Sequence, residues 1–168
     1  PPKSYPPHPL VIGRGPWAKN IWATLEALKI PYTISGKITA LDCISEARNR
    51  GNTHVIIATP LSTHYKLAEA AFLHSLPVFL EKPACSTWKE LCQLKTAWED
   101  SNRPRFLVDS IHLFSRGAEA AVNYYKAFIP PPMSVASSFG GLGPHREDCT
   151  GLWDYGWHPF SLLYALSV

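Results

Sequence analysis

The stretch Val78-Phe79-Leu80-Glu81-Lys82-Pro83 decides the predicted fold. Three consecutive apolar residues are typical of a strand that is buried on both faces of a parallel sheet. A glutamate, a lysine and a proline then end the apolar run. Because α/β folds bind ligands at the carboxyl ends of their strands, we predict that Lys82 is the reactive group of a site at that edge.

The composition argues against several classes of protein. With 46% hydrophobic and 17% charged residues, the 168-residue chain is typical of a folded globular protein. A net charge of +3 without Lys/Arg runs does not indicate a nucleic-acid partner. No stretch is apolar and long enough to predict a membrane span. The proline-rich start, residues 1–7, lacks the apolar core of a signal peptide and is predicted to be an extended lead-in.

The four cysteines have no metal-binding spacing, so we expect no metal site. Free thiols are typical of reducing compartments, and the sequence therefore favours a cytoplasmic protein.

A glycine turn follows the first apolar run, Leu10-Val11-Ile12. The stretch Gly13-Arg14-Gly15-Pro16-Trp17-Ala18 fits G-x-G-x-x-A, and apolar residues at helical spacing, from Ala18 to Leu28, come next. Glycines let the backbone approach a pyrophosphate, and a helix N-terminus offers free N–H groups. Gly13, Gly15, Pro16, Trp17 and Ala18 are therefore candidate cofactor-binding residues. The alternative is a plain tight turn between a strand and a helix.

Residues 32–35 are predicted to form a second strand, followed by a short helix over 42–49 with Leu41, Ile44 and Ala47 facing inward. In a dinucleotide fold, the end of this strand usually carries an acid for the ribose hydroxyls. Here the strand is followed by Ser35-Gly36-Lys37, without an acid. Ser35 and Lys37 could hold a 2′-phosphate, which favours NADP. A solvated turn is the alternative.

Residues 54–59 are predicted to form another buried strand, which Pro60 ends, and a helix should then run to about His74. Because the loop leaves the carboxyl end of a strand, Thr59, Pro60 and His64 are predicted to face the cofactor. A histidine at a helix start is more often a cap or a polar surface residue than a catalyst.

Beyond Pro83, Thr87-Trp88-Lys89-Glu90 has the form of a capping box. The helix that it begins is predicted to reach about Asp100 and to bury Trp88, Leu91, Leu94 and Trp98. Residues 106–114 are predicted to form a strand in which Asp109, Ser110 and His112 are polar site candidates within an apolar run. A helix around residues 118–125 and a half-exposed strand over 133–139 follow.

Asp154 and His158 form a second constellation near the end of the chain. They are four residues apart, so a helix would place them on one face. A carboxylate beside an imidazole can fix its tautomer, and such a pair could polarise a substrate hydroxyl. The alternative is a helix-start pair, with Asp154 as a cap, because Pro159 favours a helix that begins nearby.

Taken in order, these motifs resemble the glucose–fructose oxidoreductase / inositol dehydrogenase family (Gfo/Idh/MocA). The residues that carry the resemblance are the glycine turn 13–20, Ala58-Thr59-Pro60 with His64, Glu81-Lys82-Pro83, and Asp154 with His158. Residues 108–114 and Arg146-Glu147-Asp148 leading to Trp153-Asp154 look most like the branch that acts on sugars and sugar nucleotides. The resemblance extends over nearly the whole chain.

The resemblance implies an NAD- or NADP-dependent hydride transfer on a sugar, sugar-nucleotide or polyol hydroxyl. It implies that Lys82 hydrogen-bonds the reacting hydroxyl and assists proton transfer, with His158 as acid/base partner and Asp154 as its orienter. Glu81 and Lys82 would also contact the cofactor. Lys82, His112, Asp154 and His158 would contact the substrate. The resemblance also implies a homo-oligomer that forms through the second domain.

We therefore predict an α/β fold: a Rossmann-type parallel sheet with helices on both faces at residues 8–103, followed by the start of an α+β substrate domain at 104–168. The segment between the second strand and His54 is short, so part of the usual adenosine-side wall is expected to be missing. The family's second domain is a larger sheet. We thus expect a fragment, a natural truncation, or a chain that borrows the sheet from another subunit.

Two other functions fit the same sequence. A non-catalytic regulator would bind the dinucleotide and a partner protein; the presence of Lys82, Asp154 and His158 together argues against it. An inactive remnant of the family would expose a sheet edge and be unstable.

Overall fold

The computed structural model describes residues 6–35, 39–127, 138 and 149–167. By compactness the chain divides into two units, Pro1–Val108 and Asp109–Val168. The predicted domain limits, 8–103 and 104–168, stay a prediction. The predicted strand 133–139, apart from Ser138, and the stretch Arg146-Glu147-Asp148 lie outside the described residues.

The first unit contains five strands and the helices between them. Its elements are β1 (Pro9–Ile12), α1 (Pro16–Ala27), β2 (Thr33–Ser35), α2 (Ala40–Glu46), β3 (His54–Ile57), the 3₁₀ turn η2 (Leu61–Thr63), α3 (His64–Leu73), β4 (Val78–Leu80), α4 (Trp88–Asp100) and β5 (Phe106–Val108). The second unit contains the 3₁₀ turn η3 (Ile111–Phe114), α5 (Arg116–Lys126), α6 (Gly151–Tyr155) and α7 (Trp157–Ser167).

All five strands are parallel, in the order β2-β1-β3-β4-β5. The chain moves from β1 to one side for β2, then crosses back over β1 to β3 and continues outward. Connections between parallel strands are right-handed, so the reversal of direction places α1 on one face of the sheet and the later helices on the other. The order of strands reverses between β1 and β3, and a crevice at the carboxyl ends of the strands is expected there.

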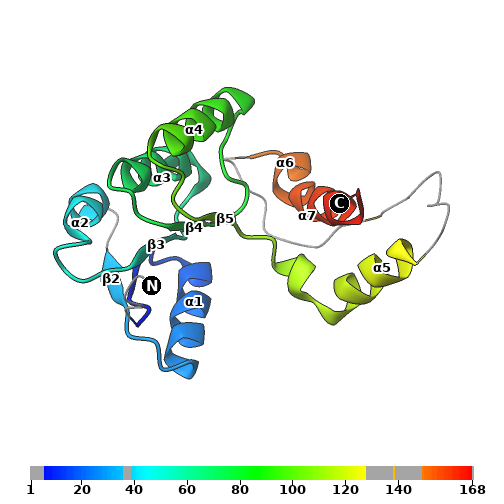
Figure 1. Cartoon of the computed structure of the whole chain (residues 1–168), viewed down its shortest axis with the longest axis horizontal. Coiled ribbons are helices and arrows are strands. Elements are labelled where there is room, and N and C mark those ends of the chain that lie inside the picture. Colours follow the sequence, from blue (N-terminus) through cyan, green and yellow to red (C-terminus); the bar gives the residue numbers. More distant parts are fainter. Residues whose placement is uncertain (1–5, 36–38, 128–137, 139–148, 168) are drawn as a thin grey trace. The chain divides into compact units, whose positions relative to one another are not determined.

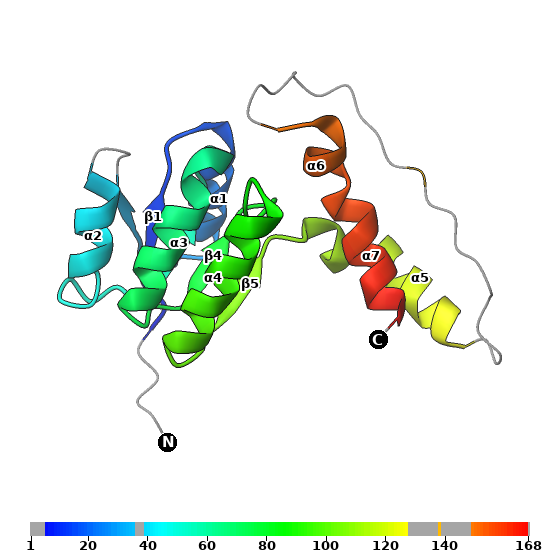
Figure 2. The ribbon, with the colours of Figure 1, turned by 90° about the horizontal axis from the view of Figure 1, so that it is seen from above.

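Helix α1 lies on one side of the sheet and α3 and α4 on the other (Figure 1). The two faces have separate cores. Val11 and Ile56 pack against Leu25 of α1 on one face. On the other face, α2, α3 and α4 lie side by side over the sheet (Figure 2). This larger core has Phe72 of α3 at its centre, fully buried and edge-to-face with Phe106 at a ring separation of 5.1 Å. The predicted Rossmann-type α/β fold is therefore confirmed.

Three residues predicted to face inward are exposed instead. Leu28 follows the last turn of α1, Leu41 lies in the first turn of α2, and Trp88 is the first residue of α4. On α2 the buried residues are Ala40, Cys43 and Ile44, so Leu41 lies one position away from the buried face. Leu28 and Trp88 lie at helix ends.

The capping box of α4 is confirmed at Thr87, whose hydroxyl accepts a hydrogen bond from Glu90 N at 3.1 Å. The Glu90 carboxylate accepts from Ser86 N, one residue before the cap. The buried face of α4 is narrower than predicted, with Leu94 buried and Leu91 and Trp98 partly buried.

The predicted strand over 106–114 is wrong beyond Val108. Strand β5 ends there, and Ile111–Phe114 forms the 3₁₀ turn η3. The apolar run continued to Phe114, but its later members are exposed rather than paired, with Phe114 at 75% exposure. None of the helices in the described part of the chain has the length and apolar character needed to span a membrane.

Candidate functional site

The glycine turn lies where the order of strands reverses. Gly13 follows β1 with a φ of +133°, which L side chains rarely adopt. A Cβ atom at this position would come within 2.1 Å of the carbonyl oxygen of Ala58, which follows β3. Ala58 N in turn donates to Ile12 O at 2.8 Å. Glycine is therefore required at position 13 by the close approach of the two strand ends.

Gly15 has a different environment. It is the N-cap of α1, has an ordinary φ of −68°, and a Cβ atom there would meet nothing within 4 Å. No side chain caps the helix, and its first turn contains no acid. The first intrahelical bond runs from Lys19 N to Gly15 O, so the N–H groups of Trp17 and Ala18 precede the intrahelical ladder. Pro16 has no N–H.

This turn fits a pyrophosphate. The space at Gly15 allows a ligand to approach the backbone, and two N–H groups stand at the positive end of a twelve-residue helix. The residues predicted from G-x-G-x-x-A therefore have the local geometry that anion binding requires. Contact with a cofactor stays a prediction for each of them.

A side-chain bond joins the glycine turn to the strand end that carries Lys82. The indole N–H of Trp17 donates to the carboxylate of Glu81, which is itself 9% exposed and follows β4 directly. Lys82 comes next, half-buried, and the Lys82–Pro83 peptide bond is cis. The structure thus brings together Trp17 and Glu81, which are 64 residues apart and were predicted from separate motifs.

His64 joins two further strand ends. Its ring is 2% exposed, with Nδ1 2.9 Å from Pro83 O and Nε2 2.9 Å from Thr59 O. A carbonyl oxygen only accepts hydrogen bonds, so a neutral ring donates to one of the two and a protonated ring to both. Thr63 Oγ1 adds a contact of 2.7 Å with Thr59 Oγ1. A direct contact of His64 with the cofactor stays a prediction.

Cys85 lies three residues beyond Lys82 but is not suited to nucleophilic chemistry. Its side chain is buried, and this burial, assisted by the nearby charge of Glu90, raises the pKa of the thiol to about 12. A thiol is the poor nucleophile and the thiolate the good one. The role of Lys82 as the reactive group at this strand end stays a prediction.

A pocket of about 400 Å³ lies beside residues 58–63, the Thr59 loop, between the start of α2 and the start of α3. Asp42 contributes one charge to its lining and Lys66 the opposite one. Ser35, predicted to hold a 2′-phosphate, ends β2 and is buried, whereas Lys37 lies outside the described residues. Their contact with a 2′-phosphate stays a prediction.

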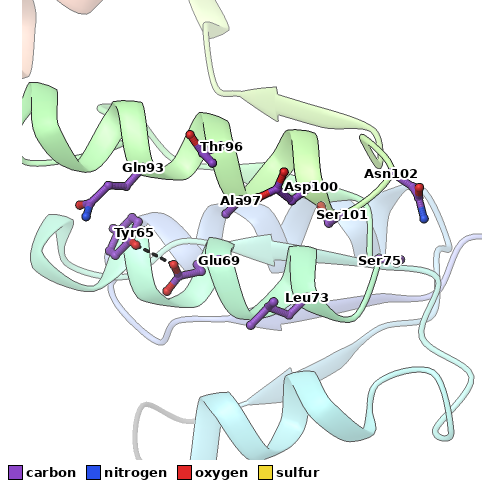
Figure 3. A pocket seen from close by; sticks show the side chains of 10 residues that line it. All are labelled: Tyr65, Glu69, Leu73, Ser75, Gln93, Thr96, Ala97, Asp100, Ser101 and Asn102. Atoms are coloured by element: carbon purple, nitrogen blue, oxygen red, sulfur yellow. Dashed lines mark hydrogen bonds between the residues drawn. The ribbon is translucent and has the colours of Figure 1, made fainter.

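A larger groove, of about 600 Å³, lies between α3 and α4 on the outer side of the helices (Figure 3). Glu69 and Asp100 both line it, and the Tyr65 hydroxyl donates to Glu69 Oε1 at 2.6 Å. This bond raises the pKa of Tyr65 to about 12. Two carboxylates would repel a pyrophosphate, so size alone does not make this groove a dinucleotide site.

In the second unit, the structure brings His112 and His158 together. Their rings are edge-to-face with centroids 4.3 Å apart, and His158 is 8% exposed. The indole N–H of Trp157 lies 2.9 Å from Asp109 O and 3.0 Å from Ser110 Oγ. Asp109 and Ser110, the buried polar candidates of the predicted strand, thus lie beside the first residue of α7.

The prediction that Asp154 and His158 share one helix is wrong. Asp154 belongs to α6 and His158 to α7, and Gly156 lies between the two helices. The cap of α6 is Thr150, whose hydroxyl accepts from Trp153 N. The alternative, that Asp154 caps the helix that begins near Pro159, stays a prediction. A glycine within a five-residue spacing was the available signal of a helix break.

Sequence patterns alone missed three features of the first unit: the Trp17–Glu81 bond, the Thr63 contact with Thr59, and the lining of the small pocket by Asp42 and Lys66. The only signal in the sequence was that each of these residues lies just after a predicted strand or in the first turn of a helix.

The sequence and the structure were compared with those of known proteins. Residues 33–109 match the family model GFO_IDH_MocA, described as "Oxidoreductase family, NAD-binding Rossmann fold". The description agrees with the expected cofactor class, a nicotinamide dinucleotide. No curated protein matches the chain.

Solved structures match over more of the chain. An oxidoreductase from Magnetospirillum magnetotacticum MS-1 is 27% identical with a TM-score of 0.80, and the match covers 97% of this chain and 57% of that protein. The scyllo-inositol dehydrogenase from Lactobacillus casei, determined with NAD(H) and scyllo-inositol, is 14% identical with a TM-score of 0.58, covering 73% and 41%.

The WlbA dehydrogenase from Chromobacterium violaceum, determined with NADH and UDP-GlcNAcA, is 16% identical with a TM-score of 0.63, covering 75% and 41%. The chain thus spans between 41% and 57% of the length of these three proteins. At 14% and 16% identity, the last two show the fold alone. The predicted resemblance is confirmed: this chain resembles the Gfo/Idh/MocA oxidoreductases, and the family's NAD-binding Rossmann model matches its residues 33–109.

Proposed function

We propose that this chain binds a nicotinamide dinucleotide at the carboxyl edge of its sheet and takes part in hydride transfer to or from a hydroxyl-bearing carbon. One observation carries the proposal. The glycine turn after β1, the Thr59 loop after β3 and residues 81–85 after β4, the Lys82 loop, are joined to one another by the side chains of Trp17 and His64.

The glycine turn would hold the pyrophosphate. Trp17 N and Ala18 N would donate to its oxygens, and Gly15 leaves the space for it. The pocket beside the Thr59 loop would receive the adenosine half, where Asp42 suits ribose hydroxyls and Lys66 suits a 2′-phosphate. Asp42 would then favour NAD. Lys66 and the predicted pair Ser35 and Lys37 would favour NADP.

Lys82 would hydrogen-bond the reacting hydroxyl and assist the transfer of its proton. The bound nicotinamide supplies the hydride acceptor or donor. A hydroxyl-bearing carbon gives up a hydride readily only when its hydroxyl loses the proton, so an amine positioned at that oxygen lowers the barrier. Lys82 is the cation that follows β4 at the ligand-binding edge of the sheet.

A sugar or polyol is the proposed substrate class. It is supported by the resemblance and by the fold shared with proteins that were determined with scyllo-inositol and UDP-GlcNAcA. The roles of Asp154 and His158 as acid/base pair, and of His112 as a substrate contact, stay predictions. Action as a homo-oligomer in the cytoplasm likewise stays a prediction.

Fluorescence titration of the 168-residue chain with NADH and NADPH tests the cofactor proposal. Trp17 lies in the glycine turn and is 43% exposed, so its emission should be quenched on binding. We expect micromolar affinity for at least one of the two dinucleotides. A folded chain that binds neither would overturn the proposal.

The substitution Gly15→Asp separates binding from folding. Gly15 has an ordinary φ and open space, and aspartate is a good N-cap, so stability should be retained or improved by a few tenths of a kcal/mol. The carboxylate would occupy the N–H groups of the first turn and repel a pyrophosphate, so affinity should fall at least about tenfold. Gly117→Asp adds the same charge to the first turn of α5 in open space and should leave affinity unchanged.

Lys82→Ala tests the catalytic role. With polyols and sugars as substrates, turnover should be lost while NADH affinity stays within a few-fold. Unchanged turnover would refute the assignment of Lys82. Tight dinucleotide binding by the unsubstituted chain without turnover on any of these substrates would favour a dinucleotide-binding regulator instead.

A further inference from the structure

His64 lies between two loops. The proposed function requires these loops to keep a fixed distance from one another. We call residues 58–63 the Thr59 loop and residues 81–85 the Lys82 loop. Both leave neighbouring parallel strands, β3 and β4, at the same edge of the sheet. His64 is the first residue of α3, and its ring is almost fully buried between them.

The contacts of His64 continue the strand pairing beyond the end of the strands. The backbone bond from Glu81 N to Ile57 O, at 3.0 Å, joins the strands where the loops begin. The ring of His64 then lies 2.9 Å from Thr59 O and 2.9 Å from Pro83 O. Each of these carbonyls is two residues beyond the backbone bond, so one imidazole spans the gap that opens as the chains diverge.

We propose that His64 is a positioning residue that fixes the distance between the Thr59 loop and the Lys82 loop, and with it the place of Lys82 relative to the bound dinucleotide. The ring takes no part in the chemistry. Its two nitrogens face backbone carbonyls, and its burial leaves little surface for a ligand. The functional part of this inference rests on the proposed function, whereas its structural part does not.

The rival role is simple core packing. A histidine that only fills space would be replaced well by a ring of similar size, because volume-conserving changes in a core are tolerated. A histidine that holds the loops by donating to their carbonyls would not, since phenylalanine can donate a hydrogen bond to neither carbonyl. Glutamine differs again, because its amide N–H groups can bond at least one carbonyl.

Hydrogen exchange followed by mass spectrometry, without nucleotide, distinguishes these roles. In His64→Phe, amides of both loops should exchange at least about tenfold faster, while β1 and β3 keep their protection. His64→Gln should give intermediate rates in the same two loops. His74→Phe makes the same change at the exposed end of α3 and should alter neither loop.

Folded His64→Phe with wild-type exchange in both loops would overturn the proposal, as would equal loosening in His74→Phe. If His64→Phe does not fold, His64→Gln decides: faster exchange confined to the two loops supports the proposal, and unchanged loops overturn it.

NADH titration of the same variants tests the functional part. We expect affinity to weaken about tenfold in His64→Phe, less in His64→Gln, and not at all in His74→Phe. Equal affinity in all variants would overturn the functional part. A wild-type chain that binds no dinucleotide would refute the proposed function, and the exchange experiment would still decide whether His64 holds the loops.

Discussion

The two units of this chain differ in what holds them together. In the first, Pro1–Val108, the sheet carries a core on each face, and residues such as Phe72, Leu10 and Ile57 are fully buried. Among the described residues of the second unit, the buried ones are polar or glycine, namely Asp109, Ser110, Gly156 and His158. Four aromatic residues of this unit, Phe114, Tyr124, Phe160 and Tyr164, are each at least 63% exposed.

This difference teaches where the stability of the chain resides. Burying a large apolar side chain contributes about 1.5–3 kcal/mol, and only the first unit does so many times over. The proposed dinucleotide site lies wholly within that unit, on loops that rigid strands position. The predicted acid/base residues lie in the unit that has no such core.

The largest effect is expected when the two units are produced separately, which tests whether each of them folds on its own. Residues 1–108 should fold alone with a cooperative thermal transition, because their core is complete within them. Residues 109–168 alone should show partial helicity without a cooperative transition, since isolated short helices are marginal in water. Circular dichroism on both fragments measures this, and a cooperative melt of 109–168 would contradict the comparison.

Two Phe→Ala substitutions, one in each unit, compare the contribution of the two units to stability within the intact chain. Phe72→Ala removes a fully buried ring packed on Phe106 and should cost about 3–5 kcal/mol. Phe114→Ala removes a ring that is 75% exposed and should change stability by less than about 0.5 kcal/mol. Denaturant unfolding measures both, and similar costs would mean that Phe114 is covered in solution.

The reactivity of the cysteines tests, without a mutation, whether the core of the first unit is closed to solvent. Burial raises the pKa of Cys85 from 9.0 to about 12, which lowers its thiolate fraction about a thousandfold at neutral pH. Iodoacetamide should therefore modify Cys85 at least about a hundredfold more slowly than exposed Cys92, with half-buried Cys149 of the second unit between them. Peptide mass spectrometry follows each site, and equal rates at Cys85 and Cys92 would contradict a closed first core.

The smallest effect is a pH dependence of the first unit. Burial lowers the pKa of His54 below its ordinary value of 6.5. The unfolded chain then binds a proton at a higher pH than the folded chain, so stability is present above about pH 6.5 and is lost as the pH falls toward the folded-state pKa. Melting of residues 1–108 between pH 7 and pH 5 should show a loss below about 1 kcal/mol. His54→Gln should reduce this slope, and an unchanged slope would assign it to other groups.

Several local features could be predicted because they depend on neighbours in sequence. The strand Val78–Leu80, the capping box at Thr87 and the glycine turn all depend on backbone geometry over a few residues. Pattern failed at helix ends and beyond strand ends. Trp88 fitted the apolar face of α4 but is exposed at the start of that helix. The apolar run 106–114 extends beyond Val108, where strand pairing ends.

By itself, the sequence determined that strands would alternate with helices and that Lys82 would follow a buried strand. It also determined that Gly13 and Gly15 would stand between a strand and a helix. These properties arise from side-chain periodicity and from the φ angles that glycine and proline allow.

Only the tertiary structure decided which of these strand ends are joined to one another. The bond from Trp17 to Glu81 spans 64 residues, and the contacts of His64 reach Thr59 and Pro83 on two different loops. Gly13 is required because Ala58 O approaches it, and that approach depends on β1 and β3 being neighbours in the sheet. The physical reason is that strand order places these groups within reach, and no local pattern in the sequence encodes that order.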